Sequence, residues 1–181
     1  MPPRLNTMVP MPTQIDLALQ IPKDLAAAIG RISLTVNTAR VLTFLLYEGL
    51  KHGGHGVSPR QISEKQFFAL ADAEAQNLVL KLAEGRLRHD PSILGQLKTT
   101  LSLAQEARRE WNEVIHHAVM VDHLGRWRVI PTTGEKRRRP VRGYMAHLEK
   151  VEGNCDQVCR ALAELYNAMT RELGWAAPNR G

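Results

Sequence analysis

Three polar residues, Arg109, Asn112 and His116, carry side chains that can act together on a phosphodiester. Their spacing of i, i+3 and i+7 places them on one face of an α-helix, which has 3.6 residues per turn. The Arg109 guanidinium can hold phosphate oxygens in a fork, and the His116 imidazole can move a proton near neutral pH. The alternative interpretation is a solvated polar stripe on an amphipathic helix.

A second group of residues is strongly basic and directly follows this stretch. Repeated cations of this kind are typical of segments that bind a phosphate backbone, and such binding weakens steeply with salt. Trp127 and Tyr144 can stack on bases. Two alternatives remain open, a solvated loop without a role and a segment that docks on an acidic protein. The cations fall within 17 positions that contain one acid, Glu135: Arg126, Arg128, Lys136, Arg137, Arg138, Arg139 and Arg142.

The hydrophobic pattern predicts four long helices that must position these groups. The first ends at Gly53 and Gly54. The second has two possible starts, Ser58-Pro59 or Ser63 with Gln66 as a capping pair. The third starts at Asp90-Pro91 by the same cap-then-proline signal. The expected ranges are about 22–52, 58–87, 91–118 and 144–173.

The third helix carries the polar stripe. Arg109, Asn112 and His116 lie about a quarter-turn from its predicted buried face, where a substrate cleft or a second subunit can sit. Arg108 lies closer to the core edge, so its aliphatic stem can pack there. His117 projects about 100° away and is interpreted as structural. The predicted buried residues are Ile93, Leu97, Leu101, Ala104, Trp111, Ile115 and Ala118.

The helical pattern stops between Asp122 and Gly143, where glycines and prolines recur. Residues 127–130 predict a short strand, and a second strand near Arg137 to Val141 completes a small hairpin. The predicted fold is therefore all-α, an up-and-down four-helix bundle with a basic β-hairpin-like insert at about 122–143 between helices three and four. Residues 22–174 form one domain, between a mobile arm (1–21) and a C-terminal tail (175–181).

Composition fits a single helical domain with an anionic partner. The 181 residues carry a net charge of +6, with 44% hydrophobic and only 5% aromatic residues. No run approaches the roughly 18 apolar residues of a membrane span. The first residues lack the continuous apolar segment of a secretory signal.

The two cysteines, Cys155 and Cys159, lie one helical turn apart, where their side chains diverge too much for an easy disulfide. A metal site would need more ligands, and His147 is the only candidate nearby. We expect two small buried residues in a reducing cytoplasm. The sequence contains no HExxH, no phosphate-binding Gly-Lys loop and no nucleophile elbow, so zinc hydrolases, nucleotide triphosphatases and serine hydrolases lack support. No helix-turn-helix spacing supports a DNA binder.

The stripe and its surroundings resemble the HEPN superfamily, helical-bundle proteins of defence and toxin systems. Its signature is an Arg, four to six residues and a His, often with Asn directly after the Arg. Arg109 and His116 have six residues between them, and Asn112 precedes His116 at the family's spacing. The pattern, with an insert and a last helix after the motif, covers about Pro22 to Leu173. Trp111 occupies the position just before Asn112 where the common form has Arg.

The resemblance implies a metal-independent endoribonuclease that acts as a homodimer without a cofactor, with an antitoxin as a possible partner. His116 would take the proton of a ribose 2′-hydroxyl or protonate the leaving oxygen. Arg109 would stabilise charge on the phosphate, and Asn112 would orient either group. The second hypothesis is a non-catalytic helical module that binds RNA or a protein through the basic insert. Trp111 favours this second hypothesis.

Overall fold

The computed structural model describes residues 22–52, 61–116, 118–121, 127–130 and 139–172. The predicted arm and tail therefore lie outside the described residues. The all-α class is confirmed, since helices hold most of the described chain. The helices are α1 (Lys23–His52), α2 (Glu64–Ala69), α3 (Asp72–Arg86), α4 (Pro91–His116) and α5 (Val141–Glu172).

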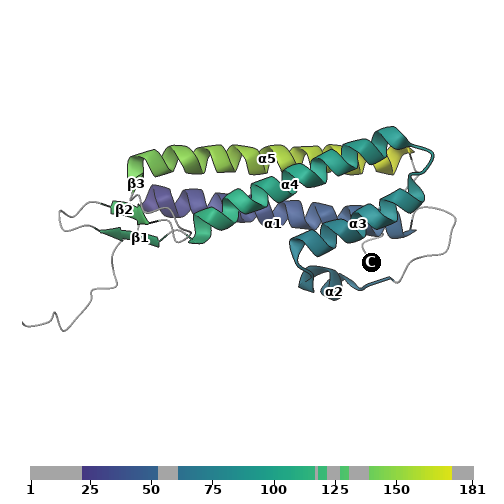
Figure 1. The fold of residues 1–181 in the computed structure, drawn as a ribbon, viewed down its shortest axis with the longest axis horizontal. Coiled ribbons are helices and arrows are strands. Elements are labelled where there is room, and N and C mark those ends of the chain that lie inside the picture. The colour runs from purple at the N-terminus through teal and green to yellow at the C-terminus, as the bar shows by residue number, and fades with distance from the viewer. Residues whose placement is uncertain (1–21, 53–60, 117, 122–126, 131–138, 173–181) are drawn as a thin grey trace, which may run out of the picture.

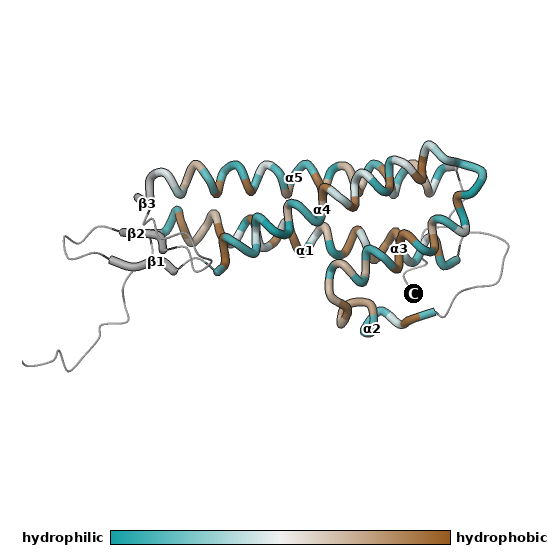
Figure 2. The backbone as a smooth tube through the Cα atoms, in the orientation of Figure 1, coloured by the Kyte–Doolittle hydropathy of each residue, from teal (hydrophilic) through white to brown (hydrophobic). Residues whose placement is uncertain are grey.

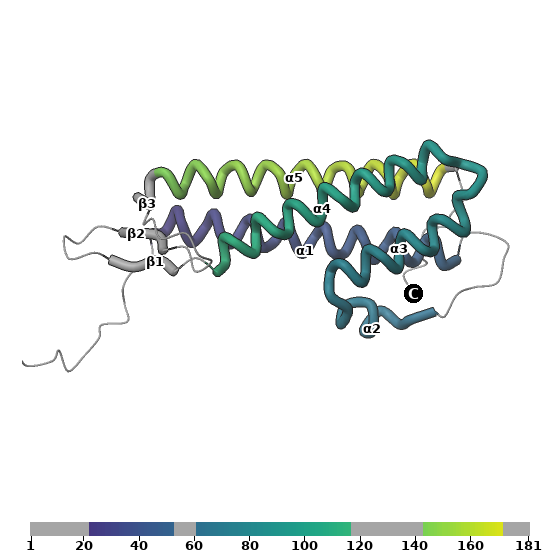
Figure 3. Tube along the Cα trace, viewed as in Figure 1, coloured from purple at the N-terminus to yellow at the C-terminus, as the bar shows by residue number. Residues whose placement is uncertain are grey.

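Three long helices, α1, α4 and α5, run the length of the molecule (Figure 1). The short helix α2 and α3 lie at one end, and the strands lie at the other. Helices α1 and α5 run in the same direction, because Arg31 pairs with Glu152 and Thr35 lies against Asp156 one turn later. Helix α4 runs the opposite way, and Figure 3 shows the same directions along the trace.

Two details of the predicted bundle are wrong. The second predicted helix is divided into α2 and α3, because Leu70 and Ala71 adopt extended backbone with ψ near 152°. The Glu74 carboxylate accepts the Ala71 backbone N–H at 3.0 Å, which starts a new helix there. The up-and-down order also fails, since α1, α3 and α5 share one direction (Figure 3). The prediction assumed short links between antiparallel neighbours, whereas the link from α1 to α3 contains a whole helix.

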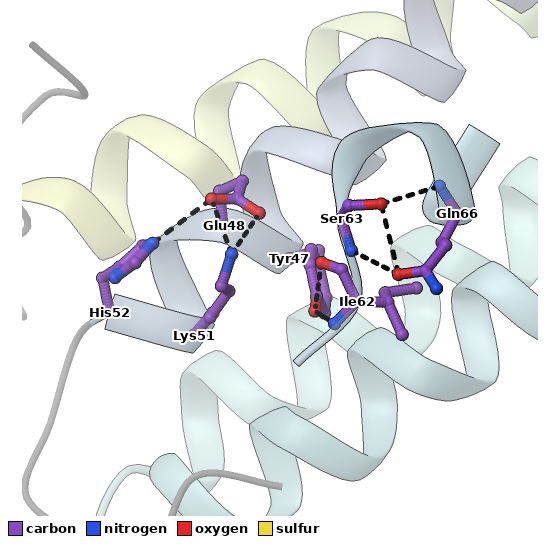
Figure 4. A network of polar contacts seen from close by, with 7 residues as sticks. All are labelled: Tyr47, Glu48, Lys51, His52, Ile62, Ser63 and Gln66. Atoms are coloured by element: carbon purple, nitrogen blue, oxygen red, sulfur yellow. Dashed lines mark hydrogen bonds and ion pairs between the residues drawn. The ribbon is translucent and has the colours of Figure 1, made fainter. Parts of the chain in front are cut away.

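The helix starts follow the capping rules. Ser63 accepts the Gln66 backbone N–H at 3.3 Å, and the Gln66 side chain accepts the Ser63 N–H at 2.8 Å (Figure 4). This confirms the Ser63 alternative for the second helix. The Tyr47 hydroxyl holds the preceding residue, accepting from the Ile62 N–H at 2.9 Å and donating to its carbonyl at 3.3 Å. Asp90 accepts from Ile93 at 3.0 Å, which confirms the predicted start of α4.

Apolar residues of α1, α3, α4 and α5 form one continuous core. Hydrophobic and hydrophilic residues alternate along α4 and α5, as expected of helices with one buried face (Figure 2). The predicted core is wrong at the end of α4, where Ile115 is 40% exposed and Val114 is buried instead. Trp111 is half-buried against the core. Val114 lies at the contact with α5, where its carbonyl oxygen accepts a hydrogen bond from Tyr144.

Three short strands connect α4 to α5. Strand β1 (Ala118–Val121) pairs antiparallel with β2 (Trp127–Ile130), which pairs antiparallel with β3 (Arg139–Pro140). Strand β2 covers the residues for which the sequence predicts a strand. Strand β1 was not predicted, because its apolar residues continue the helical pattern of α4. It begins two residues after His116, so the strands lie directly beyond the polar stripe.

Candidate functional site

The predicted catalytic residues lie on the last turns of α4. Arg109, Asn112 and His116 are all exposed, so a ligand can reach each of them. The backbone positions of Arg109 and His116 stand about 10.5 Å apart along the helix axis. The Arg109 side chain also leans toward the helix N-terminus, away from His116. A ligand that uses both groups must therefore span about two turns of α4.

Trp111, at the usual arginine position of the HEPN motif, faces inward and supports a different arginine. The Arg108 guanidinium carbon lies 4.2 Å from the centre of the indole ring, within the range of a cation–π contact. Its Nε donates to Asp72 Oδ2 of α3 at 2.7 Å. Arg108 therefore turns toward α3, at the core edge where the sequence places it, and away from His116.

A partly buried ionic cluster joins α1, α3 and α4. Asp72 is the first residue of α3. Its carboxylate forms an ion pair with Arg40 through one oxygen and with Arg108 through the other. Arg40 Nη2 also donates to the carbonyl oxygens of Phe67 at 3.3 Å and Leu70 at 2.5 Å. Burial lowers the pKa of both arginines, and the charge of Arg108 lowers the pKa of Arg40 further.

Sequence reasoning missed this cluster. Arg40 lies between apolar positions of α1, and Asp72 looks like an ordinary residue of a helix first turn. Only the packing of three helices that are distant in the sequence brings the charges together.

Two buried polar atoms lie near the cluster without a hydrogen-bond partner in the described part of the chain. They are Gln76 Oε1 and Trp111 Nε1. Gln76 is only 5% exposed and lines a hollow of about 40 Å³ together with Arg40, Asp72 and Arg108. A buried acceptor without a donor is costly unless a water or a ligand supplies one. The hollow is large enough for a water molecule, which could donate the hydrogen bond that Gln76 Oε1 lacks.

The end of α4 is fastened to α5. The Tyr144 hydroxyl donates to the Val114 carbonyl oxygen at 3.1 Å, and Tyr144 is 1% exposed. One turn earlier on α4, Glu110 accepts a hydrogen bond from the Asn154 amide of α5 at 2.6 Å. The prediction that Tyr144 stacks on bases is therefore wrong, because its ring lies in the core. The tyrosine instead holds the turn that carries His116.

Four of the seven predicted phosphate-binding cations lie outside the described residues: Arg126, Lys136, Arg137 and Arg138. The backbone of the other three is described. Arg128 lies in β2 opposite Pro140, Arg139 lies in β3 opposite Val129, and Arg142 lies in the first turn of α5. The paired strands thus carry basic residues at the end of the molecule where α4 ends (Figure 1).

Both cysteines are free, as expected from their spacing. Cys155 is buried, and burial raises the pKa of its thiol to about 11, which keeps it protonated at neutral pH. Cys159 is only half-buried, and its thiol donates to the Thr35 carbonyl oxygen at 3.2 Å. Within the described ranges, no three His, Cys, Asp or Glu residues lie close enough to hold a metal ion.

None of the described helices has the length and apolar character needed to cross a membrane.

No family model, curated protein or solved structure matches this chain. The resemblance to the HEPN superfamily therefore stays a prediction from the sequence pattern.

Proposed function

We propose that this protein binds RNA and cleaves it as a metal-independent endoribonuclease of the HEPN type. The observation that carries the proposal is the exposed stripe of Arg109, Asn112 and His116, which ends α4 two residues before the basic strands begin. An RNA strand held by the basic insert would lie across this stripe. Defence or toxin activity, with an antitoxin partner, is the setting that the resemblance implies.

The chemistry needs no external nucleophile. The ribose 2′-oxygen attacks the adjacent phosphorus and loses its proton, while the bond from phosphorus to the 5′-oxygen breaks and that oxygen takes up a proton. His116 serves one of these two transfers. Arg109 stabilises the charge that develops on the phosphate, and Asn112 orients the phosphate or the imidazole. The products carry a 2′,3′-cyclic phosphate and a 5′-hydroxyl.

The basic insert is the proposed binding site for the phosphate backbone. We propose that the seven cations of the basic insert between α4 and α5 bind successive phosphates of an RNA strand. The affinity of such binding falls as the salt concentration rises, and the fall is steeper when more phosphates are neutralised. Dimerisation is part of the proposal, since a second copy can bring another arginine near His116 across the gap of about 10.5 Å on one helix.

A second candidate is a non-catalytic helical module that binds RNA or a protein through the insert. It is favoured by Trp111, which packs inward and holds Arg108 against Asp72 at 2.7 Å. Because Trp111 and Arg108 both turn away from the stripe, Arg109 is the arginine that lies on it. This candidate predicts no cleavage by any variant, and loss of binding when Arg137, Arg138 and Arg139 are neutralised.

The two candidates separate in one assay of the full chain. Purified wild type, His116→Ala and His89→Ala are incubated with a labelled structured RNA. His89 is an exposed histidine two residues before α4 begins, whereas His116 is the last residue of α4, so His89→Ala controls for loss of a surface imidazole. We expect His116→Ala to lose cleavage while keeping RNA affinity, and His89→Ala to match wild type. Salt-sensitive binding without any cleavage would support the module instead.

A further inference from the structure

A polar cleft of about 340 Å³ lies between α1, α2 and α4, beside the proposed catalytic stripe. Its size is near the lower end of the range for small-molecule sites, roughly 300–1,000 Å³. Asn112 of the stripe follows Arg108 by four residues, so the two lie on neighbouring turns of one face of α4. The residues that border the cleft with side-chain functions are Asn37, Arg40, Phe68, Asp72 and Arg108.

The charges in the cleft favour an anion. Two arginines face one aspartate, which leaves a net charge of +1. Both Asp72 oxygens already accept an arginine, and Arg108 uses only its Nε for this contact. The two Nη groups of Arg108 are the pair that binds phosphate as a fork. Its side chain is 33% exposed, and the indole of Trp111 fixes the plane of the guanidinium.

Phe68 supplies an aromatic surface at the same cleft. Phe68 is 39% exposed, and its ring packs on Phe44 at 5.2 Å and on Phe67 at 5.8 Å between ring centres. Arg40 donates to the carbonyls of Phe67 and Leu70, which flank Phe68, so it holds the turn that carries this ring. A fixed, partly exposed ring is a platform on which a nucleic-acid base can stack.

Gln76 lies in a small hollow that adjoins the cleft and supplies a buried acceptor there. Its side chain is 5% exposed, and its Oε1 has no donor within the described chain. It lines the hollow of about 40 Å³ that shares Arg40, Asp72 and Arg108 with the cleft. A ligand hydroxyl, or a water between ligand and protein, can donate to this oxygen.

We infer that the cleft binds one nucleoside monophosphate unit, with the phosphate in the Arg108 fork and the base stacked on Phe68. The unit comes from an RNA strand or from a free nucleotide. As a subsite on the path of RNA, the inference rests on the proposed function, and the strand then continues past Asn112 to His116. The backbone positions of Arg108 and His116 stand about 12 Å apart along α4.

The test uses the full chain with three free ligands, uridine 5′-monophosphate, uridine and inorganic phosphate, and with a short single-stranded RNA. We expect the monophosphate to bind better than uridine or phosphate alone. Phe68→Ala and Arg108→Gln should each weaken binding of the monophosphate and of the RNA by about tenfold. Arg31→Gln is the matched control, because it removes an exposed arginine of α1 that pairs with Glu152 of α5 and does not border the cleft. It should leave binding of the free monophosphate unchanged.

A photo-crosslink keeps the test independent of variant folding. RNA containing 5-iodouridine should crosslink to Phe68 of the wild-type chain. RNA binding without this crosslink, and with unchanged affinity in folded Phe68→Ala, would overturn the inference while the proposed function stands. Monophosphate binding that needs Phe68 and Arg108, in a chain that does not bind RNA, would support a free-nucleotide site and contradict the proposed function. Equal affinity for inorganic phosphate and the monophosphate would overturn the stacking role.

Discussion

The hydroxyl of Tyr144 donates a hydrogen bond to the carbonyl oxygen of Val114 across 3.1 Å, and both residues are buried. Val114 lies in the last turn of α4, where carbonyl groups have no partner within the helix. The bond therefore satisfies a helix end from the neighbouring helix. It also fixes the turn that presents His116 to solvent.

Tyr144→Phe removes the hydroxyl that makes this bond and keeps the aromatic ring. The buried Val114 carbonyl is left without its donor, so we expect the free energy of unfolding to fall by about 1–3 kcal/mol. Urea denaturation measures this change. If the bond positions the catalytic turn, the variant should also cleave RNA more slowly at a temperature where it is fully folded. An unchanged denaturation midpoint would show that the bond does not hold the end of α4.

Alkaline pH should destabilise the fold through two buried groups. Burial raises the pKa of Tyr144 from 10.0 to about 12 and that of Cys155 from 9.0 to about 11. The folded state therefore holds both protons more tightly than the unfolded chain does. The resulting stabilisation is complete below pH 9 and is lost as the pH rises through 11 and 12.

Thermal denaturation from pH 8 to 12 checks this prediction. Cys155→Ala should flatten the decline between pH 9 and 11, because the group that titrates there is gone. A wild-type melting temperature that stays constant to pH 12 would contradict the assigned burial of both groups.

Asp72→Asn should be strongly destabilising. The change leaves Arg40 and Arg108 facing each other in a partly buried site without a counter-charge. Breaking such a pair typically costs about 3–5 kcal/mol when fully buried, and partial exposure here reduces the figure. Glu152→Gln is the matched control, since its partner Arg31 is 57% exposed and surface pairs contribute about 0–1 kcal/mol. Equal effects of the two substitutions in chemical denaturation would refute the structural role of the cluster.

Gly153→Ala should stabilise the protein by about 0.5–1 kcal/mol, because alanine has the higher helix propensity. Gly153 lies inside α5, and a Cβ there would meet no heavy atom of the described chain within 4 Å. The close contact that an interior glycine can permit is therefore absent among the described residues. A lower melting temperature in the variant would mean that the glycine serves a contact outside them.

Local signals predicted much of the fold. Asp90-Pro91 marked the start of α4 because a capping side chain acts within three residues of itself. Ser63 with Gln66 marked α2 for the same reason. The break at Leu70 and Ala71 was missed, since neither residue is a helix breaker and the extended backbone is held by contacts from Arg40 and Glu74.

In the candidate site, too, local features could be predicted from the sequence and tertiary contacts could not. The stripe of Arg109, Asn112 and His116 follows from helix periodicity, and all three positions are exposed as a ligand site requires. The Arg40–Asp72–Arg108 cluster and the inward turn of Tyr144 depend on which helices pack together. Helix order and direction are tertiary properties, and the periodicity of one helix does not encode them.

The central claim is cleavage by attack of the ribose 2′-oxygen, and it is tested most directly with two oligonucleotides of one sequence. One is RNA and the other carries 2′-deoxyribose throughout, and both are incubated with wild type and His116→Ala in EDTA. The account predicts that wild type cuts only the RNA, that its products end in 2′,3′-cyclic phosphate and 5′-hydroxyl, and that His116→Ala cuts neither. Equal cutting of the deoxy strand, or cutting that EDTA abolishes, would contradict it.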